Sequence, residues 1–229
     1  MIQKKLEELN QTWQQERSYR FFTIDGVLNY KNWETQTPKI LFLLKESADG
    51  FIDIAGRGHN ITKGNGPHFW WNICYWKYLI NNISTKRNYE FVSKFELPEV
   101  KNNNYILDSI SYVNIKKNNE GKTKSERNDI LKYARQDKYF LKKQLDIIEP
   151  NVIFCSQDTF DAYKHIYDSV LIKINNNCFK HNERLIINFY HPSYGFMKGG
   201  REAIYNVLRD NLTFENNLME QFNWYKNIN

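Results

Sequence analysis

Short apolar runs separated by helix-forming stretches constrain the fold of this chain more than any other feature. Runs rich in β-branched and aromatic residues occupy residues 39–44, 110–115, 152–155, 170–174 and 185–190. Their length and composition are typical of buried strands. Strands that alternate with helices build a mostly parallel sheet with helices on both faces. We therefore predict an α/β fold, a three-layer α/β/α sandwich around a mostly parallel central sheet.

Apolar residues at helical spacing, such as Ile2, Leu6, Leu9 and Trp13, predict an amphipathic helix over residues 1–18. Further helices are expected at residues 67–83, 126–149 with a break near Asp137, 158–167, 201–209 and 215–225. No repeat or low-complexity linker divides the chain. We expect a single domain over residues 1–229, with an N-terminal helical extension at 1–35 and a C-terminal helical tail at 211–229.

Polar side chains follow three of the predicted strands where each strand ends. Glu46 follows the first, Asn114 lies at the end of the second, and His191-Pro192-Ser193 follows the last. In a parallel sheet these ends meet at one edge, which is where ligands bind in open α/β folds. A carboxylate can position a water, an amide can pair with a base edge, and an imidazole can donate to an oxygen that gains charge. Each side chain could instead have a purely structural role.

The charge distribution favours a polyanionic partner. The chain carries 32 basic and 26 acidic residues, a net charge of +6. Residues 101–145 contain eleven basic and five acidic side chains, an excess that equals that of the whole chain. Such a local excess fits nucleic-acid binding, although a solvated helix face would give the same pattern.

Several classes of protein are disfavoured by the composition. Three widely spaced cysteines fit neither a disulfide framework nor a metal site. No apolar stretch is long enough to span a membrane, and no secretory signal is visible at the first residues. We expect a cytoplasmic protein with no membrane association, no metal and no cofactor.

The order of these strand ends resembles that of the uracil-DNA glycosylase superfamily, in a branch without an iron–sulfur cluster. The resemblance covers roughly residues 38–210 and includes the helix–proline–strand segment at 141–154. It implies that Asn114 reads a base flipped out of DNA and that His191 stabilises the negative charge on the departing base. It also implies that Glu46 positions the attacking water. Ser47 stands where other branches carry an aspartate, so Asp49 and Asp53 remain alternatives for this role.

The resemblance also implies residues that contact the base and the DNA. Candidates for stacking on the base are Phe51, His59, Phe69 and Trp70, and Phe69 and Trp70 could instead belong to the core. Candidates for a wedge inserted into the duplex are Tyr194, Phe196 and Met197. Ser193, Lys116, Lys117, Lys122 and Lys124 are expected to contact phosphate.

The predicted function is hydrolysis of an N-glycosidic bond in DNA by a monofunctional, monomeric DNA glycosylase, as in base-excision DNA repair. The long loop at residues 45–66 departs from uracil-specific members, so the excised base could be uracil, a damaged base or a modified pyrimidine of viral DNA. The last would indicate defence rather than repair. A non-catalytic nucleic-acid-binding module and a hydrolase of small nucleosides are the alternatives.

Overall fold

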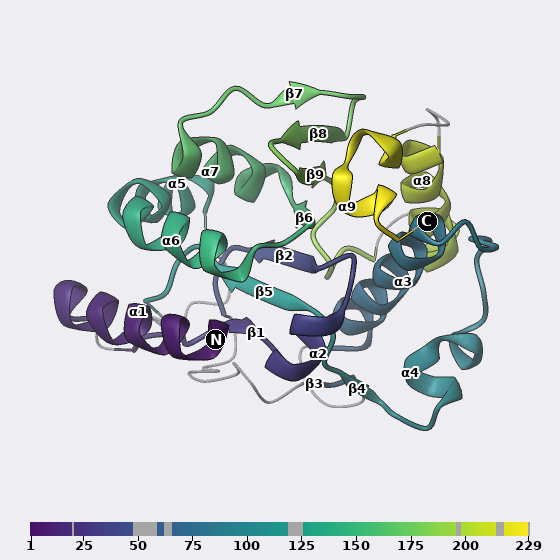
Figure 1. Cartoon of the computed structure of the whole chain (residues 1–229), viewed down its shortest axis with the longest axis horizontal. Coiled ribbons are helices and arrows are strands. Elements are labelled where there is room, and N and C mark those ends of the chain that lie inside the picture. Colours follow the sequence, from purple (N-terminus) through teal and green to yellow (C-terminus); the bar gives the residue numbers. More distant parts are fainter. Residues whose placement is uncertain are drawn as a thin grey trace.

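A mixed β-sheet forms the centre of the protein (Figure 1). The computed structural model describes residues 1–19, 21–47, 59–61, 66–118, 126–195, 198–213 and 218–228. Among these residues the main sheet has seven strands in the order β1-β5-β2-β6-β9-β8-β7. They are β1 (Gly26–Val27), β2 (Ile40–Leu44), β5 (Ser111–Asn114), β6 (Val152–Cys155), β7 (Ile172–Lys173), β8 (Cys178–His181) and β9 (Arg184–Asn188). A separate small ladder pairs β3 (His59–Asn60) with β4 (Ile106–Leu107).

The four central strands, β5, β2, β6 and β9, are parallel, as the sequence predicts. The edges differ from the prediction, because β1, β8 and β7 run antiparallel to their neighbours. The β8–β9 hairpin turns at residues 182–183, where Asn182 adopts a left-handed φ of 53°. A connection this short can join only antiparallel strands. The protein is thus α/β with a mixed sheet, compatible with a three-layer sandwich.

Alternation along each central strand divides the core into two halves. Ile40, Phe42 and Leu44 belong to one apolar cluster, and Leu41 and Leu43 to the other. Successive side chains of a strand point to opposite faces, so an unbroken apolar run indicates a strand covered on both sides. In Figure 1, α3 and α8 cover one face, and α1, α5, α6 and α7 lie across the other.

The helices confirm most of the sequence prediction. They are α1 (Ile2–Arg17), α2 (Tyr30–Thr35), α3 (Gly66–Ser84), α4 (Pro98–Lys101), α5 (Arg127–Gln136), α6 (Lys138–Ile148), α7 (Gln157–Tyr167), α8 (Gly200–Thr213) and α9 (Asn223–Lys226). Short 3₁₀ turns lie at Lys94–Glu96 and Met219–Gln221. The expected break at Asp137 separates α5 from α6. The buried Asp137 carboxylate accepts from Arg17 Nε at 2.6 Å and from Tyr19 Oη at 2.8 Å.

The first 35 residues are integrated into the fold rather than appended to it. Leu6, Leu9 and Trp13 of α1 are buried in the core, and β1 pairs with β5. The Trp13 ring stacks on Phe140 of α6 with centroids 5.1 Å apart. No helix in the described ranges has both the length and the apolarity needed to cross a bilayer.

Replacing Trp13 with alanine should lower the free energy of unfolding by about 3–5 kcal/mol, because it leaves a cavity between α1 and α6. Thr12→Ala on the exposed face of the same helix is the matched control and should change it by less than about 0.5 kcal/mol. Urea denaturation followed by circular dichroism measures both. Equal stability of the two variants would contradict the packing of α1 against α6.

Candidate functional site

The carboxyl edge of the parallel strands gathers the three polar positions singled out in the sequence. Asn114 ends β5, Glu46 follows β2 by two residues, and His191 follows β9 by three. Strands β5 and β9 are three positions apart in the sheet, roughly 14 Å at ~4.8 Å per strand. Asn114 and His191 therefore suit opposite sides of a ligand rather than direct contact with each other.

A buried carboxylate fixes the orientation of Asn114. Asp25 Oδ2 accepts from the Asn114 backbone N–H at 2.8 Å and from its side-chain Nδ2 at 2.9 Å. Asn114 Oδ1 is buried and has no hydrogen-bond partner in the described chain. A buried acceptor left unpaired costs about 1–3 kcal/mol, so such an atom is suited to a donor brought by a ligand. Asn114 thus presents an acceptor at the edge of the sheet.

The lysines after β5 are not on the surface, and the prediction that they contact phosphate is wrong for both. Lys117 is fully buried, with its ammonium on Asp25 Oδ1 and 5.3 Å from the centre of the Trp13 ring. Burial lowers the pKa of Lys117, and the Asp25 carboxylate opposes this effect. Lys116 is only 1% exposed. Both lysines are held inward because buried carboxylates lie within reach of their side chains.

Lys116 pairs with the candidate catalytic carboxylate. Its Nζ lies 2.9 Å from Glu46 Oε2, and the Glu46 side chain is 8% exposed. The second carboxylate oxygen, Oε1, is buried without a hydrogen-bond partner among the described residues. The ion pair therefore orients Glu46 and leaves one oxygen available to accept a proton from a water or a ligand.

His191 is arranged as a neutral hydrogen-bond donor. The Ser193 N–H donates to His191 Nδ1 at 3.2 Å, and Ser193 Oγ lies 2.7 Å from the same atom. Because Nδ1 accepts, the neutral ring carries its proton on Nε2. Burial, reinforced by the nearby Lys45 ammonium, lowers the pKa of His191 to about 4. The contact found for Ser193 is with His191, and its predicted phosphate contact stays a prediction.

The first turns of α3 hold the turn that carries His191. Asn72 Nδ2 donates to the carbonyls of Pro192 at 2.7 Å and Tyr194 at 3.0 Å. The Phe69 ring is 6% exposed and lies 5.9 Å from the His191 ring, at an angle of 43°. Phe69 is therefore next to the candidate donor, although most of its surface is packed in the core.

Other predicted contacts lie at the margin of the site or outside the described residues. Tyr194 stacks on Tyr190, with centroids 4.4 Å apart and planes at 8°, so its ring is held against the protein. The backbone of His59 pairs with Leu107 in the small ladder. The following predicted residues lie outside the described ranges: Asp49, Phe51, Asp53, Lys122, Lys124, Phe196 and Met197.

Sequence reasoning missed the residues that position the site. Asp25 and Asn72 contact partners 89 and 120 residues away, respectively, so no local pattern marks them. Lys45, adjacent to Glu46, pairs with Asp158 at the start of α7 and lies close to His191. Its position directly after a predicted strand was the one available signal for Lys45.

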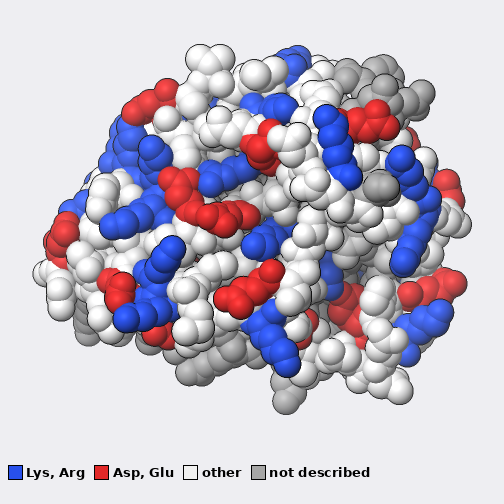
Figure 2. Space-filling model, viewed as in Figure 1, with Lys and Arg blue, Asp and Glu red and all other residues white. Residues whose placement is uncertain are grey.

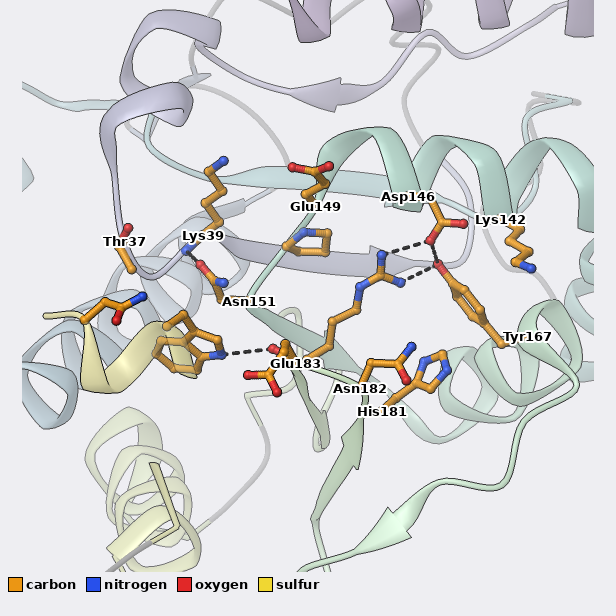
Figure 3. Close-up of a pocket in the computed structure, with 14 residues that line it drawn as sticks. Thr37, Lys39, Lys142, Asp146, Glu149, Asn151, Tyr167, His181, Asn182 and Glu183 are labelled. Carbon is orange, nitrogen blue, oxygen red and sulfur yellow. Dashed lines mark hydrogen bonds and ion pairs between the residues drawn. The ribbon is translucent and has the colours of Figure 1, made fainter. Parts of the chain in front are cut away.

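A cavity of about 740 Å³ lies at the amino end of the parallel strands, near the start of β2, β6 and β9 and opposite the candidate site (Figure 3). Arg184 in this cavity donates to Tyr167 Oη at 2.5 Å and to Asp146 Oδ1 at 2.9 Å. His181 is joined to Tyr163 Oη at 2.7 Å through its Nδ1. These contacts give Arg184, Asp146, Tyr167 and His181 structural partners within the protein.

Charges of both signs are interspersed over the face seen in Figure 2, which has no single continuous basic patch. Several cations of residues 101–145 are neutralised by carboxylates. Arg127 pairs with Asp161, and Lys138 with Asp168. Together with burial of Lys116 and Lys117, these pairs reduce the surface charge that the sequence predicts for this segment.

Comparison of the chain with protein-family models, curated proteins and solved structures finds no match. Within the described ranges, no group of three or more histidine, cysteine, aspartate or glutamate side chains is placed to hold a metal ion.

The pKa of His191 predicts a pH dependence of stability. Its folded-state pKa of about 4 lies below the ordinary value of 6.5, so the unfolded chain binds the proton more tightly. Stability attributable to His191 should be complete above pH ~6.5 and fall by about 2–3 kcal/mol as the pH drops to ~4.5. Urea denaturation should show this loss in the wild type but not in His191→Gln. Equal pH profiles would contradict it.

The Asp25–Lys117 pair predicts a non-additive double mutant. Asp25→Ala should destabilise the protein by about 3–5 kcal/mol, because it leaves the Lys117 charge buried and unpaired. Adding Lys117→Met removes that charge and should recover part of the loss. Chemical denaturation of both single variants and the double variant measures the coupling. Additive effects would show that the two side chains do not interact.

Proposed function

We propose that this protein is a DNA N-glycosylase with a uracil-DNA glycosylase-like three-layer fold, acting on a base flipped out of DNA. The observation that carries the proposal is the complementary set of polar atoms at the carboxyl edge. Asn114 Oδ1 and Glu46 Oε1 are unpartnered acceptors in the described chain, and His191 Nε2–H is a donor. A nucleobase with a ring N–H beside a carbonyl, together with a water, matches this set.

The geometry supports a division of roles. Asn114 accepts from the base N–H, and His191 donates to a base oxygen. As the bond between the sugar C1′ and the base nitrogen breaks, its electron pair moves onto the base. The His191 N–H stabilises the resulting charge without itself being charged, consistent with its low pKa. A water attacks C1′, and its proton passes to the Glu46 carboxylate, which Lys116 orients.

A uracil-type pyrimidine, unmodified or enlarged, presents such an edge, as does a deaminated purine with a ring N–H beside its carbonyl. Such a base is hidden inside duplex DNA, so the substrate nucleotide must leave the stack or come from single-stranded DNA. The aromatic residues of α3 beside His191, Phe69 above all, then form the wall of the pocket nearest the donor. DNA is accordingly the proposed partner.

His191→Ala should slow base release by about 10²–10³-fold, because it removes one preorganised donor to the developing anion. His165→Ala, which changes an exposed histidine of α7, is the matched control and should leave the rate unchanged. Mass spectrometry of bases released from uracil-containing, deaminated and modified viral DNAs measures the rate and identifies the base.

Glu46→Gln retains the shape of the side chain and should also slow release, while both site variants keep binding DNA. If the wild type binds DNA yet releases no base from any of these substrates, the protein is a binding module and the enzymatic proposal fails. The Lys116–Glu46 ion pair is the observation that favours this second possibility, because it partly neutralises the only predicted catalytic carboxylate in the described chain.

A further inference from the structure

A small cavity of about 120 Å³ lies beside the turn that carries His191. Its walls include His68 and Asn72 of α3, Tyr194 and Gly195 of the turn, and Gly200 and Arg201 at the start of α8. The helices α3 and α8 are in contact and lie next to each other in Figure 1. Pockets for whole organic ligands usually measure ~300–1,000 Å³, so this cavity suits a single compact group.

Arg201 enters this cavity without a carboxylate partner in the described chain. The other partly buried arginines in the described ranges, Arg17, Arg184 and Arg209, each pair with an aspartate or glutamate. Arg201 Nε is buried and has no hydrogen-bond acceptor, and the guanidinium lies 5.7 Å from the centre of the Tyr75 ring. Burial lowers the pKa of Arg201, which indicates a desolvated charge with little compensation from the protein.

The surrounding backbone adds further affinity for an anion. Gly199 and Gly200 have φ values of 93° and 66°, which favour glycine, and they lead directly into α8. The first N–H groups of a helix have no partner within it and attract negative charge. On the opposite wall, a Cβ at Gly195 would lie 3.4 Å from His68 Nδ1, so glycine keeps this side of the cavity open.

Asn72, which also lines the cavity, already uses its amide N–H groups within the protein. Both contacts of Asn72 Nδ2 go to carbonyls of the turn, and its Oδ1 is buried without a partner in the described residues. The donors available to a ligand are therefore the Arg201 guanidinium, the α8 amides and a ring nitrogen of His68. A guanidinium fork matches the oxygens of a phosphate or carboxylate, and the adjacent candidate site points to a nucleic-acid ligand.

We propose that Arg201, His68 and the first turn of α8 bind one phosphate of the nucleic-acid backbone close to the flipped nucleotide. The assignment rests on the proposed function, because the cavity adjoins the turn that holds His191 and Ser193. Bound there, the phosphate anchors the strand while the base reaches Asn114. Arg201 is thus a binding residue of the DNA strand, distinct from the groups that act on the base.

The test measures binding rather than catalysis. Duplex DNA with one stable abasic-site analogue is titrated at about 50 and 200 mM salt, followed by fluorescence anisotropy. Arg201→Gln should weaken binding about 3–10-fold at low salt and reduce the slope of log affinity against log salt by about one, since one phosphate contact is lost. Arg209→Gln, on the same helix but paired with Glu90 and Asp210, is the matched control and should keep the wild-type slope.

Replacing single phosphates near the abasic analogue with neutral methylphosphonates locates the contact. Replacing the phosphate that Arg201 contacts should weaken DNA binding by the wild type. The same replacement should not weaken DNA binding by Arg201→Gln any further. Circular dichroism and the unfolding midpoint confirm that each variant is folded. If the wild type binds DNA and Arg201→Gln binds with the same affinity and slope, the phosphate site is wrong while the proposed function stands.

A second arm separates a backbone phosphate from free phosphate. If the wild type binds no DNA, the proposed function fails, and thermal unfolding with added inorganic phosphate is then decisive. A rise in unfolding midpoint in the wild type and Arg209→Gln, absent in Arg201→Gln, assigns the cavity to free phosphate and overturns the backbone assignment. No rise in any of the three overturns the site altogether.

Discussion

The buried carboxylate of Asp25 connects more of this structure than any other side chain of the site. It accepts hydrogen bonds from Asn114 and Gln144, and it pairs with the ammonium of Lys117. These partners come from the end of β5 and from α6, while Asp25 itself directly precedes β1. Because a charge without water is stable only when paired and hydrogen-bonded, the positions of all these elements depend on one another.

The polar side chains of the candidate site are held in fixed orientations by neighbouring groups. Asp25 sets the direction of the Asn114 amide, Lys116 sets that of Glu46, and the Asn72 amide holds the turn that carries His191. Each polar group at the carboxyl edge is thus oriented by a second group from a different element. Orientation fixed before a ligand arrives lowers the cost of ordering these groups on binding, which is the main advantage of a preorganised polar site.

Local patterns were sufficient for most of the fold and for the placement of Glu46, Asn114 and His191 after parallel strands. The apolar runs at 40–44 and 152–155 are strands, and the helical segment at 126–149 breaks at Asp137 as predicted. Polar or short segments were less informative. The strand β8 lies in a stretch with little apolar patterning, and β1 has only two residues, so both take their conformation from the neighbours with which they pair.

The sequence by itself determined the order of the central strands and the longer helices, and it set Glu46, Asn114 and His191 where parallel strands end. The spacing of apolar residues and the positions of prolines are local properties, so they can be recognised in the sequence without the fold. Only the tertiary structure decided that Lys116 and Lys117 turn inward and that Asn114 presents an acceptor. It also left Arg201 without a carboxylate in the described chain. These outcomes depend on which side chains, distant in sequence, are buried together in the low-dielectric interior. Tertiary packing determines this, and no local pattern does.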